Sequence, residues 1–184
     1  MASTSTDTNH LFPVFLKLEN LRLLIVGGGY VGMEKLQTVI NNSPATKIKL
    51  VARLISNEIK ELSKNYPNIQ LVQKPYAAND LNNIDIVIAA INEKEITTQI
   101  VMDANARGIL VNAADKPELC DFYLGSIVKK GNLKIAISTN GKSPTIAKRV
   151  KEVIHDFIPD EMDQLLMNMQ SVRNNIHGNF DDKV

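Results

Sequence analysis

Residues 21–36 read LRLLIVGGGYVGMEKL, and this stretch decides the fold. A short apolar run leads into GGGYVG, and apolar residues at helical spacing follow, which predicts a strand, a tight turn and a helix. In such a turn Gly27 permits the sharp change of direction, Gly29 lets a pyrophosphate approach the backbone, and Gly32 lets the helix pack against the sheet. The N-terminus of the helix then offers free N–H groups to an anion. We therefore expect a dinucleotide site; a glycine turn that binds nothing, or that holds S-adenosylmethionine, is the alternative.

The composition is that of a globular protein, with 184 residues, 44% of them hydrophobic and 22% charged. The formal net charge of +1 favours neither a nucleic-acid nor a membrane partner. No apolar run approaches the roughly 20 residues of a membrane span. The single cysteine, Cys120, excludes an internal disulfide and suits a reducing compartment, so we expect a cytoplasmic protein. The first ten residues, MASTSTDTNH, lack the pattern of a secretory signal and are predicted to be a short disordered leader.

Strand-like and helix-like segments alternate along the first part of the chain, which predicts an α/β fold with a Rossmann-type, doubly wound parallel sheet. The edge strand is expected at 12–18, where Pro13 suits an edge and not the centre of a sheet. Gly108 is expected to cap the third helix in a left-handed conformation. The other expected strands are 21–26, 48–52, 69–73, 84–91 and 109–113; the expected helices are 30–40, 56–65 and 93–107, with a loop or short helix at 76–83.

The pattern changes after Asp115. Two β-like runs, 122–128 and 133–139, are separated by KKGN and predict a β-hairpin. Ser143 and Pro144 are then expected as the N-cap and first residue of a helix. Its apolar face and that of a second helix, which begins near Pro159, consist of Ile146, Val150, Val153, Ile154 and Phe157, and of Met162, Leu165, Leu166, Met169, Val172 and Ile176.

We therefore expect three parts: an NAD-binding Rossmann domain at 11–113, a hairpin dimerisation and substrate-loop region at 114–146, and C-terminal helices at 147–184. A hairpin and two helices bury little apolar surface alone, so they should pack against the first domain or a second copy of the chain.

Five stretches together resemble the precorrin-2 dehydrogenase and sirohydrochlorin ferrochelatase family of siroheme synthesis, over residues 12–157. They are FPVFLKL, LRLLIVGGGYVGMEKL, IDIVIAAIN, VNAADKP and LKIAISTNGKSPTIAKRV. The combination of NAAD at 112–115 with the STNGKSP loop selects this family. The resemblance implies a first domain that binds NAD and a second part that forms a homodimer and, with the first, a tetrapyrrole pocket. It implies NAD-dependent oxidation of precorrin-2 to sirohydrochlorin and, in some members, insertion of Fe²⁺ to give siroheme.

The resemblance assigns the catalytic role to Asp115. This residue follows the carboxyl end of a predicted central strand, where ligands bind in open α/β sheets. A carboxylate there could accept the proton released by dehydrogenation, or the pyrrole N–H protons released by metal insertion. The alternative is an aspartate that merely opens the turn DKP.

The predicted cofactor residues are Gly27, Gly28, Gly29, Tyr30, Val31, Arg53, Leu54 and Ala90; the predicted substrate residues are Asn112, Ser138, Thr139, Gly141 and Lys142. VARL at 51–54 lacks the usual acidic ribose ligand, so NADP stays open because Arg53 could meet a 2′-phosphate. The family uses NAD without a fixed acid at this place, and NAD is therefore the expected cofactor. Asn140 stands where the family has a glycine, and could narrow the substrate loop.

Seven basic residues, with no acidic residue among them, could attract the carboxylates of a tetrapyrrole substrate; for most of them the alternative is a solvated face of the hairpin and helix. They are Lys129, Lys130, Lys134, Lys142, Lys148, Arg149 and Lys151. They lack the aromatic interleaving and the reader motif of a nucleic-acid site.

His10, His155 and His177 are far apart, so no protein metal site is expected and Fe²⁺ would be a co-substrate held by the tetrapyrrole. No tyrosine has a lysine four places on, which excludes a short-chain dehydrogenase. A non-catalytic, NAD-sensing regulatory domain is the alternative function; it explains the glycine turn but neither Asp115 nor the basic loop.

Overall fold

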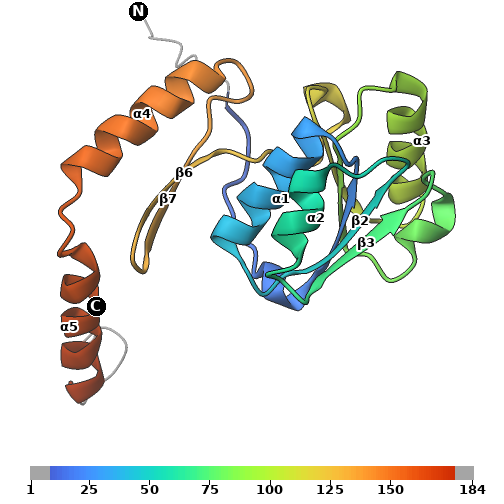
Figure 1. Ribbon diagram of the computed structural model, residues 1–184. Coiled ribbons are helices and arrows are strands. Elements are labelled where there is room, and N and C mark those ends of the chain that lie inside the picture. Colours follow the sequence, from blue (N-terminus) through green and yellow to red (C-terminus); the bar gives the residue numbers. More distant parts are fainter. Residues whose placement is uncertain (1–8, 177–184) are drawn as a thin grey trace, which may run out of the picture. The chain divides into compact units, whose positions relative to one another are not determined.

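The computed structural model describes residues 9–176 (Figure 1). These residues divide into two compact units, one formed by Pro13–Tyr123 and the other by residues 124–176 together with residues 9–12. Most of the predicted leader, the last part of the predicted 147–184 region and His177 lie outside the described residues.

The first unit is a five-stranded parallel sheet in the order β3-β2-β1-β4-β5, so the predicted Rossmann-type fold is confirmed. Its strands are β1 (Arg22–Val26), β2 (Lys47–Ala52), β3 (Ile69–Gln73), β4 (Ile86–Ala89) and β5 (Leu110–Ala113), and its helices are α1 (Tyr30–Asn42), α2 (Asn57–Ser63) and α3 (Lys94–Asn105). Short 3₁₀ helices occur at Leu18–Asn20, Ala78–Leu81 and Pro117–Leu119. The strand order reverses at β1 and β4, and ligands bind beyond the carboxyl ends of strands at such a point.

Alternate residues of the central strands fill two separate cores. Leu23 and Ile25 of β1 lie with α1 and α2, whereas Leu24 and Val26 lie with α3. Figure 1 shows α1 and α2 together on one face of the sheet and α3 on the other. Because both faces are covered, β1 and β4 are apolar at nearly every position, which explains the continuous apolar runs of the sequence.

The edge strand expected at 12–18 is wrong. Residues 11–17 form no regular element, and a 3₁₀ turn follows at Leu18–Asn20. Phe12 and Phe15 are 86% and 67% exposed, so this apolar segment finds neither a partner strand nor a core among residues 9–176. An apolar run forms a strand only where backbone groups meet a neighbouring ladder, and Pro13 removes one donor.

The second unit is an antiparallel hairpin of β6 (Ser126–Lys130) and β7 (Leu133–Ile137), followed by α4 (Pro144–Phe157) and α5 (Met162–Asn175), as predicted. Gly131 and Asn132 form a two-residue turn in which Gly131 has a φ of +55°. Ser143 caps α4, since its hydroxyl oxygen accepts a hydrogen bond from the Ile146 N–H at 3.2 Å. No helix within residues 9–176 has the length and apolar character that crossing a membrane requires.

Candidate dinucleotide site

Gly27 and Gly32 are required for packing at the end of β1. Gly27 has a φ of +131°, and a Cβ there would lie 2.2 Å from the carbonyl oxygen of Ala90. A Cβ on Gly32 would lie 2.2 Å from the carbonyl oxygen of Gly27. Any side chain at either position would therefore push α1 or the end of β4 away from the turn.

Gly28 and Gly29 differ in what surrounds them. A Cβ on Gly28 would lie 2.2 Å from the carbonyl oxygen of Leu54, so Gly28 lets the segment after β2 approach the turn. Apart from the two chain neighbours of Gly29, no atom of residues 9–176 lies within 4 Å of a Cβ built on this residue. Gly29 is the N-cap of α1 and makes no side-chain cap hydrogen bond, so the first turn of α1 presents its N–H groups to open space. Room beside the backbone and donors without a side-chain cap fit a pyrophosphate.

The other predicted cofactor residues of the first unit lie around this turn. Tyr30 and Leu54 are 85% and 80% exposed. Ala90 is buried, and its N–H donates to the carbonyl oxygen of Val26 at 2.7 Å. Val31 is half-buried and packs against the core beneath α1.

Arg53 follows β2, and its guanidinium Nη1 lies 3.7 Å from Oε2 of Glu93 at the N-terminus of α3. Both side chains are 60% exposed. The ion pair therefore joins the segments that follow the two strands on either side of β1.

Asp115 lies in a loop beyond β5, at the same edge of the sheet. Its side chain is exposed and its φ is +60°, in the left-handed region. The N–H of Ala114 donates to the carbonyl oxygen of Ala89 at 2.9 Å, which ties this loop to the end of β4. The structure thus brings the Asp115 carboxylate and the glycine turn to one edge of one unit.

The segment from Cys120 to Phe122 closes the base of the Asp115 loop. The Cys120 Sγ lies 3.2 Å from both the nitrogen and the carbonyl oxygen of Ala113. Asp121 accepts a hydrogen bond from the Val111 N–H at 2.8 Å through its carboxylate. Asn112 is buried, and its amide nitrogen donates to the Phe122 carbonyl oxygen at 2.8 Å. Asn112 therefore holds the base of the Asp115 loop.

The predicted substrate residues of the second unit form a turn before α4. The Thr139 hydroxyl accepts from the Ser143 N–H at 3.3 Å, and the Lys142 N–H donates to the Thr139 carbonyl oxygen at 3.0 Å. The Ser138 hydroxyl accepts from the Asn140 N–H at 3.1 Å. Asn140 and Gly141 have φ values of +54° and +73°. Asparagine tolerates this left-handed conformation, so it can occupy a glycine position of the loop.

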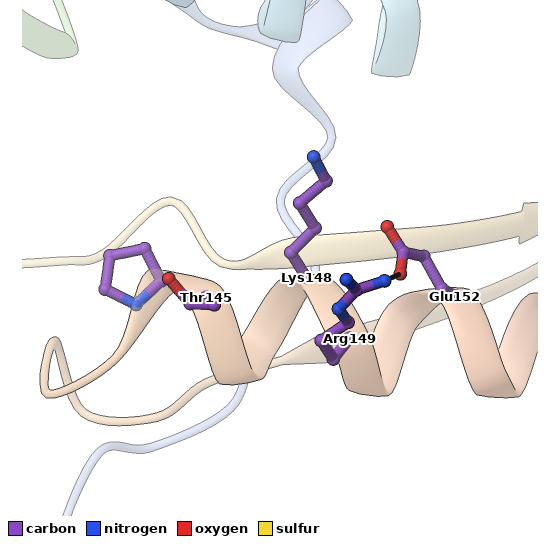
Figure 2. A pocket seen from close by; sticks show the side chains of 5 residues that line it. Thr145, Lys148, Arg149 and Glu152 are labelled. Carbon is purple, nitrogen blue, oxygen red and sulfur yellow. Dashed lines mark hydrogen bonds and ion pairs between the residues drawn. The ribbon is translucent and has the colours of Figure 1, made fainter.

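The basic residues of the second unit are partly neutralised by acidic partners. Figure 2 shows a hollow on α4 in which the Arg149 guanidinium meets Glu152, with a distance of 2.7 Å between Nη1 and Oε2. Lys148 lines the same hollow. Lys130 pairs with Asp160, and this lysine lowers the pKa of the Asp160 carboxyl. In the part of the chain that the structure describes, no group of His, Cys, Asp and Glu residues could hold a metal ion.

A family model described as "Putative NAD(P)-binding" matches residues 14–126. The chain belongs to this NAD(P)-binding family. A second model, described as the central part of a sirohaem biosynthesis protein, matches residues 130–156.

Two curated relatives align with most of this chain. A siroheme synthase from Psychrobacter arcticus is 35% identical over 148 residues, which are 80% of this chain and 26% of that protein. A siroheme synthase from Pseudoalteromonas translucida is 31% identical over 168 residues, 91% of this chain and 35% of that protein. The chain thus spans about a quarter to a third of the length of these relatives. The predicted resemblance to the siroheme-synthesis family is confirmed.

A solved structure named SirC, precorrin-2 dehydrogenase, shares the fold. Its TM-score is 0.74 at 23% identity, over 94% of this chain and 85% of that chain. The match includes both the sheet and the segments that follow it, because it covers nearly the whole chain.

Glu93 and Cys120 contribute contacts to this edge of the sheet that the sequence analysis did not predict. Glu93 is the N-cap of α3, shortly after β4, and Arg53 directly follows β2. The carboxyl ends of parallel strands meet at one edge of the sheet. The sequence could therefore have predicted that these two residues lie close together, because each follows a strand. The sequence gave no such signal for Cys120, because only the fold of the loop brings its thiol to the backbone of Ala113.

Proposed function

We propose that this chain oxidises precorrin-2 to sirohydrochlorin with NAD⁺ as the hydride acceptor. The observation that carries the proposal is the union of an NAD(P)-binding segment with a sirohaem-biosynthesis segment in one chain. The exposed Asp115 carboxylate, at the same sheet edge as the glycine turn, supports it. The relatives named siroheme synthase support the same pathway step.

The residues of the glycine turn suit NAD. The open space beside Gly29 and the N–H groups of the first turn of α1 would hold the pyrophosphate. Leu54 and Tyr30 present exposed apolar surface to the nucleoside parts. When bound, the nicotinamide accepts the hydride that leaves the tetrapyrrole.

Asp115 would take the proton that leaves with the hydride. Oxidation of one carbon–carbon or carbon–nitrogen unit to a double bond releases a hydride and a proton, and the proton needs a base. Asp115 is exposed, and the structure gives its carboxylate no hydrogen-bond donor within residues 9–176. The carboxylate is thus available to a substrate.

The second unit would bind the substrate and a second copy of the chain. The turn of Ser138, Thr139, Gly141 and Lys142 offers the Ser138 hydroxyl, backbone amides and the Lys142 ammonium to substrate carboxylates. The Thr139 hydroxyl shapes this turn, because it donates to the Ser143 carbonyl oxygen at 3.1 Å. Apolar side chains of α4 and α5 remain exposed in the single chain, which favours a homodimer. We propose insertion of Fe²⁺ into the product as a second activity. We expect both reactions to take place in the cytoplasm.

The test is anaerobic turnover of precorrin-2 with NAD⁺, followed by absorbance, for the wild type and for Asp115→Asn. Asparagine tolerates the left-handed backbone at this position, so the variant should fold and bind NAD⁺ as the wild type does. We expect turnover to fall by about 10²-fold or more, the range of a lost general base. Equal turnover in both proteins would show that Asp115 is not the base of the reaction. No oxidation by a wild type that binds the nucleotide would favour a regulatory NAD sensor.

Ferrous iron added to the completed reaction tests the second activity. Faster formation of siroheme than in a protein-free control would establish a chelatase. Sirohydrochlorin that persists would show that this chain needs a separate chelatase.

A further inference from the structure

Two charged residues, Arg53 and Glu93, follow the strands on either side of β1 and form an ion pair. β2 and β4 are the neighbours of β1 on its two sides. Adjacent strands lie about 4.8 Å apart, so the ends of β2 and β4 are roughly 10 Å from each other. Arg53 after β2 and Glu93 after β4 close that gap with their side chains, to 3.7 Å between Nη1 and Oε2.

The backbones that carry the two residues are held against the turn. The Ser56 N–H donates to the carbonyl oxygen of Gly28 at 2.8 Å, and the carbonyl oxygen of Leu54 occupies the space of a Gly28 side chain. On the other side, the Ala90 carbonyl oxygen occupies the space of a Gly27 side chain. Arg53 and Glu93 thus project from two segments that the glycines fix in place.

Arg53 occupies a position that decides between NAD and NADP in this fold. The residue near the end of the second strand of this fold meets the ribose 2′ position, where an acid selects NAD and an arginine accommodates the 2′-phosphate of NADP. Arg53 alone would therefore favour NADP. Glu93 occupies the guanidinium and adds a negative charge that repels a phosphate at the same place.

We propose that Glu93 sets the preference for NAD by pairing with Arg53. In this role Glu93 takes the place of the acidic ribose ligand that is missing at the end of β2. The acidic side chain comes instead from the segment after β4, on the other side of β1. The inference rests on the proposed NAD-dependent function and names the residue that determines its cofactor specificity.

Glu93→Gln removes the charge with little other change. The side chain of Glu93 makes no cap hydrogen bond; it is the backbone carbonyl that accepts from the N–H and hydroxyl of Thr97, both at 2.9 Å. Glu95→Gln is the matched control, because Glu95 lies in the first turn of the same helix, is exposed, and is not the ion-pair partner of Arg53.

The experiment is calorimetric titration of the full chain with NADP⁺ and NAD⁺. For Glu93→Gln we expect the affinity for NADP⁺ to rise about two- to five-fold, the range of one exposed charge interaction, with the affinity for NAD⁺ unchanged. Adding Arg53→Gln to Glu93→Gln should abolish the gain. Circular dichroism of each variant verifies its fold.

An unchanged NADP⁺ affinity in Glu93→Gln, or an equal gain in Glu95→Gln, would overturn the inference. A wild type that binds the two nucleotides equally would also overturn it. A protein that shows the expected affinities but does not oxidise precorrin-2 would contradict the proposed function and leave the role of Glu93 intact. A protein that binds neither nucleotide would overturn both.

Discussion

Gly28 and Gly29 are neighbours in one turn but have different surroundings, so their alanine variants should fail in different ways. A Cβ on Gly28 would strike the Leu54 carbonyl oxygen, a backbone atom that cannot rotate aside. We expect Gly28→Ala to lower the free energy of unfolding by about 1–3 kcal/mol, the usual cost of overpacking. Urea denaturation measures this loss.

Gly29→Ala should leave stability within about 0.5 kcal/mol, because the new methyl group enters open space and the backbone is extended there. The same methyl group would hold a pyrophosphate away from the first turn of α1. Losing one charge-assisted hydrogen bond should weaken NAD⁺ binding by about ten-fold or more. Unchanged NAD⁺ affinity in a folded variant would contradict the placement of the pyrophosphate at Gly29.

Arg22 and Asp85 show at the scale of the elements how β1 is aligned with β4. The Asp85 carboxylate accepts from the Arg22 backbone N–H at 2.8 Å and from the guanidinium Nε and Nη2 at 2.9 and 2.8 Å. These hydrogen bonds lower the pKa of Asp85 to about 2. The contacts join the start of β1 to the residue before β4 and support their parallel register.

This lowered pKa predicts a pH-dependent contribution to stability. A carboxyl whose folded pKa lies below its ordinary value of about 4 stabilises the fold above that value, and its contribution is lost as the pH falls toward 2. Asp85→Asn should cost about 0.5–1 kcal/mol at pH 7, since the pair is partly exposed and screened. In urea denaturation the difference from the wild type should be constant between pH 7 and 5 and smaller at pH 3. A difference that grows at low pH would refute this account.

The loop that carries Asp115 depends on Cys120. The thiol contacts both backbone polar groups of Ala113, and burial raises its pKa. Cys120→Ala should lower turnover several-fold and speed hydrogen exchange at the Ala113 N–H, because that donor loses its acceptor. Cys120→Ser should restore both, since a hydroxyl can accept and donate in the same place. If Cys120→Ser restored slow hydrogen exchange but not turnover, turnover would not depend on the closure of this loop.

The elements that the sequence predicted are those whose pattern is local. The glycine turn, the apolar runs of β1 and β4, and the Ser143 cap each depend on neighbouring residues, and all were predicted. The expected strand at 12–18 failed because a strand also needs a partner ladder. The Cys120 contacts join segments that only the fold of the loop brings together, so composition and spacing could not reveal them. The Arg53–Glu93 pair was missed although both residues follow strands whose carboxyl ends meet at one edge of the sheet.

At the scale of the whole molecule, the exposed apolar residues predict association of two chains. Val153 and Phe157 of α4 are 68% and 86% exposed, and Met169 and Val172 of α5 are 59% and 53% exposed. Monomeric proteins rarely expose apolar residues in such groups, and most soluble assemblies are symmetric dimers of one chain. We therefore expect a dimer at about 10 µM by light scattering and sedimentation.

Phe157→Glu should shift this equilibrium toward the monomer, because it places a charge in a surface that association would bury. Lys151→Glu is the matched control: it also introduces a glutamate on α4, at an exposed polar position. A wild-type monomer, or equal dissociation by both variants, would contradict a dimer formed through this face. If Phe157→Glu is monomeric, folded and still binds NAD⁺, its turnover of precorrin-2 decides whether the second copy is needed for the chemistry, because the glycine turn and Asp115 both belong to the first unit.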